Sequence, residues 1–132
     1  MVDFLNPLLR PKNVTATIEE YVTPDGGRCD IVLTYISNGQ VMKLVVEAKG
    51  QWNKELFSAA EVQLYNRYAQ HPDAATQGIY LVYWFGSDVK VAGKKAHAFE
   101  NPEGLRQRLT SNIQTEIASR IDVVILDVSK DA

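Results

Sequence analysis

The sequence predicts an α/β domain in which a mixed β-sheet is flanked by helices. Three observations lead to this fold class. Three segments rich in β-branched residues follow one another within the first fifty positions and are separated by turn residues. A nearly all-apolar segment at 77–85 is typical of a central strand. Farther on, apolar residues recur every four positions, the spacing of a helix with one apolar face: Leu105, Leu109, Ile113 and Ile117.

The first half of the chain is expected to form an antiparallel meander. Its three strands are expected over 14–22, 28–35 and 41–49. Pro24 fixes the backbone at the first corner of one turn, and two glycines follow it closely. The dipeptide Asn38-Gly39 is typical of a two-residue hairpin turn. The second and third strands should therefore pair directly around Asn38 and Gly39.

A helix is expected after the meander, from Asn53 to about residue 70. The Asn53 side chain is suited to capping a helix start, and Trp52 and Phe57 are spaced for a hydrophobic staple across it. The periodic apolar residues then predict a second helix of about 16 residues. A last strand at 121–128 completes the order strand, strand, strand, helix, strand, helix, strand.

Length and composition indicate one domain with its own core. The 132 residues are 45% hydrophobic and 23% charged. We expect an irregular arm at 1–13 and a single domain at 14–132. Cys29 is the only cysteine, which excludes an internal disulfide and fits a reducing, cytoplasmic setting. The longest apolar run has seven residues, far short of the roughly 20 that span a membrane, so no membrane partner is expected.

Two acids and a lysine are predicted to meet at one end of the sheet. Side chains alternate between faces along a strand, so Glu47 and Lys49 share a face, roughly 6–7 Å apart. The hairpin brings Asp30 toward them. Asp30, Glu47 and the Ala48 carbonyl are hard oxygen donors of the kind that holds Mg²⁺. Lys49 would orient the attacking water and stabilise charge on a phosphate, so the pattern points to metal-assisted hydrolysis of a phosphodiester.

These residues also have simpler interpretations. They could form an ordinary cross-strand salt bridge on the surface, although the apolar run at 44–46 favours a central strand, where Glu and Lys need partners or ligands. A two-carboxylate glycoside hydrolase fits poorly, because Lys49 would hold Glu47 ionised and prevent it from donating a proton.

The helix after the meander contains a second anomaly. Gln63 and Arg67 fall in the middle of its apolar face, four residues apart, where Leu or Ala would be expected. Conflicts of this kind concentrate at functional sites. The alternative is that Gln63 bonds to buried backbone and that Arg67 extends to solvent.

These residues resemble a known nuclease motif. Asp30, the triplet Glu47-Ala48-Lys49 about 17 residues later, and Gln63 on the next helix are similar to the core of the PD-(D/E)xK nuclease superfamily, which has the restriction-endonuclease-like fold. The runs VEAKGQWNKEL and QLYNRY, followed by GIYLVYWF, resemble nuclease domains fused to large bacterial proteins, some of them in antiphage defence. The resemblance covers residues 28–85.

The resemblance implies a Mg²⁺-dependent deoxyribonuclease, an endonuclease with little sequence specificity, in which Mn²⁺ can replace Mg²⁺. Asp30 and Glu47 would bind the metal with Ala48, Lys49 would be the catalytic lysine, and Gln63 would lie beside the site. Paired cleavage of two strands would favour a homodimer.

The chain also departs from the superfamily pattern. Cys29 stands where a proline often precedes the first acid, and Arg67 stands where the RecB-like branch has tyrosine. The helix that usually precedes the meander has a poor match in 1–13, which hints at a domain cut from a longer protein. Glu19 or Glu20 could supply a third acid.

The densest basic cluster is expected to bind the DNA backbone. It combines Lys90, Lys94 and Lys95 with His97, and Arg67 is a further candidate contact. The alternative is a solvated polar loop. The rival function is a catalytically inactive module of the same fold that binds nucleic acid or protein. The intact set of two acids and a lysine favours the nuclease.

Overall fold

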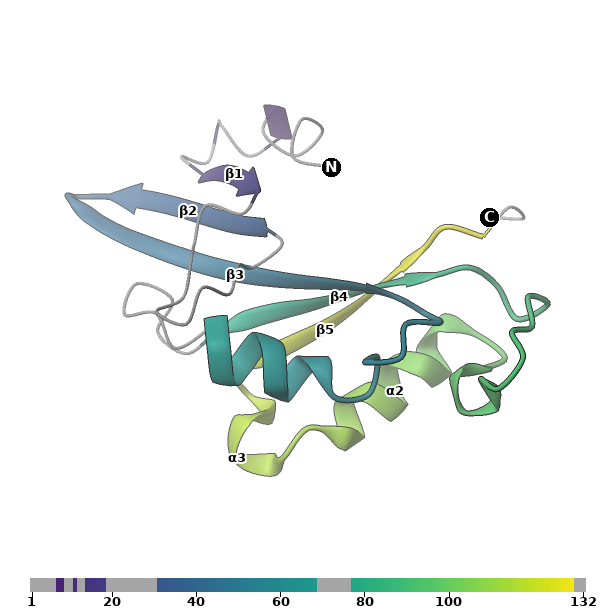
Figure 1. Ribbon diagram of the computed structural model, residues 1–132. Helices are drawn as coiled ribbons and strands as arrows, with labels where there is room; N and C mark the ends of the chain where they lie inside the picture. Colours follow the sequence, from purple (N-terminus) through teal and green to yellow (C-terminus); the bar gives the residue numbers. More distant parts are fainter. Residues whose placement is uncertain (1–6, 9–10, 12–13, 19–30, 69–76, 130–132) are drawn as a thin grey trace.

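The structure, a computed structural model, describes residues 7–8, 11, 14–18, 31–68 and 77–129 (Figure 1). Its centre is one mixed sheet with the strand order β1-β2-β3-β4-β5. The strands are β1 (Val14–Ile18), β2 (Ile31–Ser37), β3 (Gln40–Gly50), β4 (Gly78–Trp84) and β5 (Ile121–Asp127). β1, β2 and β3 pair antiparallel, whereas β4 and β5 run parallel to β3. The predicted α/β class, with an antiparallel meander and further strands, is confirmed.

The hairpin between β2 and β3 has the predicted turn. Asn38 and Gly39 both have positive φ, at 51° and 78°. Two successive residues with positive φ match the right-handed twist of the two strands, and residues such as Asn and Gly adopt positive φ with little strain. Ser37 pairs with Gln40, and the ladder continues without a slip to Ile31 and Val46. The turn therefore sets which residues of β2 and β3 share a face.

The first long helix begins later than the sequence predicts. Asn53 does act as a cap, because its Oδ1 accepts a hydrogen bond from the Glu55 N–H at 2.8 Å. The next hydrogen bonds close three-residue turns, from Leu56 N–H to Asn53 O and from Ser58 N–H to Glu55 O. The helix η2, with π-type hydrogen bonding, then spans Ala60–Tyr68. The expected end near residue 70 lies outside the described residues.

The second predicted helix is divided in two. After the short helix η4 (Lys95–His97), α2 covers Pro102–Asn112 and α3 covers Thr115–Ala118. Ile113 between α2 and α3 has extended backbone angles (φ −78°, ψ 134°). This break exposes the Gln114 N–H, which donates to Glu61 Oε1 of η2 at 2.7 Å. The contact with η2 thus takes the place of continuous helix between α2 and α3. All four periodic apolar residues are nevertheless buried, as expected for the apolar face of a helix.

The main core lies between one face of the sheet and the helices. In Figure 1, η2, α2 and α3 lie on the same side of the sheet. Alternate residues of the strands pack there against apolar residues of the helices. The members include Val32, Val45, Tyr80, Val82, Trp84, Leu56, Leu64, Leu105 and Leu109. On the opposite face, Ile31 and Val46 form a smaller cluster with Leu33, Ile79 and Leu81. In the described residues the helices that pack on the sheet therefore cover one face of it.

Candidate active site

Glu47 and Lys49 lie in the central part of the sheet, on the face that the helices cover. β3 is paired on both sides, with β2 and with β4. Glu47 and Lys49 follow Val45 at two-residue steps, so they share its face. Glu47 is only 3% exposed. The prediction of a central strand is confirmed, and a surface position for Glu47 is excluded.

The two side chains form an ion pair. Lys49 Nζ lies 3.3 Å from Glu47 Oε1, and the exposed fractions of the side chains are 15% for Lys49 and 4% for Glu47. A carboxylate taken out of water is costly unless a positive charge compensates it. Lys49 supplies that charge and still reaches the solvent. The site therefore combines a buried carboxyl group with a lysine whose side chain still reaches the solvent.

Tyr80 borders Glu47 on the next strand. It is the register partner of Glu47, and its hydroxyl donates a 2.6 Å hydrogen bond to the Leu56 carbonyl. Burial raises the pKa of Tyr80 well above its ordinary value, and the negative charges of Glu47 and Glu55 raise it further. Tyr80 stays neutral beside two acids. Next to Glu47, Tyr80 therefore acts as a neutral hydrogen-bond donor to the backbone.

We expect Tyr80→Phe to lower the free energy of unfolding by about 1–3 kcal/mol, because the buried Leu56 carbonyl loses its donor. Urea unfolding measures this loss, with Tyr35→Phe, at an exposed position of β2, as the control. A folded-state pKa above the ordinary value of 10.0 contributes stability that is lost as the pH rises through it. The wild type should therefore lose more stability above pH 10 than Tyr80→Phe does. Equal alkaline profiles would contradict this assignment.

The oxygen atoms of Glu47 and Ala48 are the type of ligand that a hard divalent cation prefers. Glu47 offers carboxylate oxygens, and Ala48 is the next residue of the same strand. Asp30, the other predicted metal ligand, lies outside the described residues, as do Glu19 and Glu20. Within the described ranges, no three side chains from His, Cys, Asp and Glu gather into a metal-binding group. A complete site would thus need an acid from the undescribed part of the chain.

Of the other predicted site residues, the structure describes the three lysines but not the side chains on η2. Gln63 and Arg67 belong to η2, but their side chains lie outside the described part. Lys90 and Lys95 are exposed and Lys94 is half-buried, in the segment that links β4 to α2. This segment lies at the same end of the sheet as the carboxyl end of β3 (Figure 1).

His97 does not belong to the exposed basic cluster, contrary to the prediction. Its side chain is buried, and Nε2 donates to the Asn53 carbonyl at 3.1 Å. The imidazole also lies against the rings of Phe57 (4.8 Å between centroids) and Trp52 (6.5 Å). The two residues expected to form a staple thus both contact His97. The partner of the imidazole is 44 residues away, so no local pattern indicated its burial.

Sequence reasoning also missed Gln51. This fully buried side chain accepts a hydrogen bond from the Phe85 N–H (3.0 Å) and donates to the His97 carbonyl (3.3 Å). It joins the segment after β3 to the segment after β4. Gln51 thereby fixes the backbone two residues beyond Lys49. Its position after a glycine gave no local signal of this role.

No family model, curated protein or solved structure matches this chain. In the described residues no helix is both long enough and apolar enough to cross a membrane.

Proposed function

We propose that the chain is a metal-dependent deoxyribonuclease of the PD-(D/E)xK type, with a restriction-endonuclease-like fold. The observation that carries this proposal is the buried Glu47 with Lys49 Nζ 3.3 Å away, on one face of a central strand. The element order also supports it, because an antiparallel meander, a helix and a parallel strand follow one another as in the family that the motif resembles.

The acids and the lysine would divide the chemistry between them. Glu47, with Asp30 and the Ala48 carbonyl, would hold Mg²⁺ or Mn²⁺, which supplies positive charge to the phosphate and activates water when bound. Lys49 would place its ammonium group beside the phosphate and stabilise the additional negative charge of the transition state. The effect is strong because the pair is largely shielded from water.

The proposal requires Asp30 to lie opposite Glu47. The described ladder ends at the pair Ile31 and Val46. Asp30 precedes Ile31 in the sequence and Glu47 follows Val46, so one further step of the same register would pair the two acids. Directly opposed residues of an antiparallel pair share a face, with Cβ atoms about 4.5–5.5 Å apart, a separation that one metal ion can bridge.

A second candidate function is a binding module of the same fold without catalysis. The ion pair between Glu47 and Lys49 favours it, because each charge already has a partner and both residues could serve the structure alone. In that case the protein would bind DNA or another protein, and divalent cations would change nothing at Glu47.

Cleavage of supercoiled plasmid by the full chain distinguishes the two functions. We expect nicked and then linear plasmid with Mg²⁺ or Mn²⁺ and no conversion with EDTA. Little sequence specificity predicts similar rates on plasmids of unrelated sequence. If the folded protein leaves the plasmid supercoiled at millimolar Mg²⁺ and Mn²⁺, the nuclease proposal is wrong and the binding module is favoured.

A further inference from the structure

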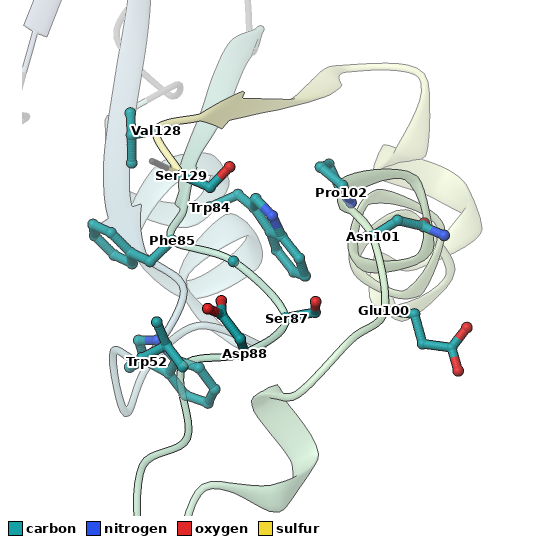
Figure 2. A pocket seen from close by; sticks show the side chains of 12 residues that line it. Trp52, Trp84, Phe85, Ser87, Asp88, Glu100, Asn101, Pro102, Val128 and Ser129 are labelled. Carbon is teal, nitrogen blue, oxygen red and sulfur yellow. The ribbon is translucent and has the colours of Figure 1, made fainter. Parts of the chain in front are cut away.

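A cavity of about 880 Å³ opens beyond the carboxyl ends of the parallel strands β4 and β5 (Figure 2). Neither Glu47 nor Lys49 lines it. Crevices outside the carboxyl ends of parallel strands are the usual ligand sites of open α/β sheets. The volume lies within the range of pockets that bind small molecules. The cavity is thus a candidate ligand site separate from the ion pair on β3.

Three aromatic side chains line this cavity. Trp84 is 3% exposed, so its ring is almost fully covered, whereas the half-buried Trp52 and the 42% exposed Phe85 offer ring surface to a ligand. The faces of aromatic rings carry a negative quadrupole that attracts cations, with Trp the most effective. These walls suit a flat, positively charged group better than an anion.

The charged groups of the cavity are all acidic. Asp88 and Glu100 line it, and the described lining residues include no lysine or arginine. The Asp88 carboxylate points into the space beside the indole of Trp84, whereas Glu100 points outward at the rim (Figure 2). Lys90, Lys94 and Lys95 belong to the same connecting segment but do not line the cavity. The charge of the cavity therefore complements a cation and opposes a phosphate.

The backbone after β4 positions Asp88. Gly86 is buried and has φ +121°, a conformation that residues with a side chain rarely adopt. A Cβ atom built on Gly86 would lie 2.7 Å from Asp88 Oδ1, so the carboxylate packs against the glycine itself. The turn thus directs the acid back over the segment and into the cavity.

We propose that this cavity binds an arginine side chain of a protein partner. A guanidinium group is planar, stacks on indole rings and donates several hydrogen bonds to a carboxylate. Its alkyl stem can also pack against the aromatic rings that line the cavity. The proposal does not depend on nuclease activity, because the site shares no residue with the candidate metal site.

Two-dimensional NMR of the full chain tests this proposal. The protein has two tryptophans, and both line the cavity, so both indole N–H signals report on it. Titration with acetyl-Gly-Arg-Gly-amide should shift these signals saturably, with a dissociation constant in the millimolar range. The matched peptide with citrulline, a neutral isostere of arginine, should bind at least about fivefold more weakly, because a neutral group lacks the cation–π and charge-assisted contacts.

Variants assign the binding to Asp88. Asp88→Asn should weaken binding of the arginine peptide at least about fivefold, and Asp122→Asn, at an exposed position of β5, should leave it unchanged. Equal binding of the arginine and citrulline peptides would overturn the proposal, as would the lack of any saturable shift. Tighter binding of deoxyguanosine monophosphate than of the arginine peptide would also overturn it and would assign the cavity to a nucleotide.

Discussion

Lys49→Ala should lower the rate of Mg²⁺-dependent plasmid cleavage at least about a hundredfold, because loss of one group that stabilises transition-state charge typically costs that much. The rate of conversion of supercoiled plasmid measures the effect. Lys43→Ala is the matched control, since Lys43 lies on the same strand and the same face but pairs with Thr34. The control should cleave at the wild-type rate.

Removal of Lys49 also takes one charged partner away from the buried Glu47. Such a loss destabilises proteins by about 3–5 kcal/mol, so the alanine variant must be shown to fold. The double variant Glu47→Gln/Lys49→Met removes both charges and should be more stable than Lys49→Ala. Equal cleavage by wild type and a folded Lys49→Ala protein would contradict the role of Lys49 and would indicate another site or a contaminant.

Glu47→Gln should abolish both cleavage and stabilisation by divalent cations. An ion that binds only the folded state raises its stability according to the ion concentration and affinity, so Mg²⁺ or Mn²⁺ should raise the Tm of the wild type relative to EDTA. The variant retains the size of the side chain but loses the carboxylate. Because Lys49 is partly exposed, the unpaired ammonium can turn to solvent, and the variant should fold.

Differential scanning fluorimetry with and without EDTA measures this effect. Glu116→Gln, at an exposed position of α3, is the control and should keep the full response. If Glu47→Gln responds to Mg²⁺ and Mn²⁺ as the wild type does, Glu47 is no metal ligand, and the mechanism fails even if the protein cleaves DNA.

The sequence predicted the β2–β3 hairpin and the faces of β3 correctly, because turn residues and the alternation of side chains along a strand determine them. The turn at Asn38 and Gly39 depends on two residues that tolerate positive φ, and its position sets the register of β2 against β3. Alternation along β3 then places Glu47 and Lys49 on one face. The shared face of Glu47 and Lys49 could be predicted because it depends on this strand alone.

The features that the sequence did not predict depend on contacts between residues far apart in the chain. The break at Ile113 lets the Gln114 backbone reach Glu61, a contact across 53 positions. The buried His97 donates a hydrogen bond from Nε2–H to the Asn53 carbonyl, and periodicity carries no information about such a pair. Residue type suggested a basic surface for His97, whereas packing against Phe57 makes it part of the interior.

The position of a bound metal tests the central claim most directly. X-ray diffraction from crystals of the full chain grown with Mn²⁺ would locate the ion, because Mn²⁺ scatters anomalously. The nuclease proposal predicts an ion bound through oxygen to the Glu47 carboxylate, with Asp30 as a second ligand and Lys49 beside it. An Mn²⁺ site elsewhere, with the ion pair between Glu47 and Lys49 intact and no ion on Glu47, would contradict it.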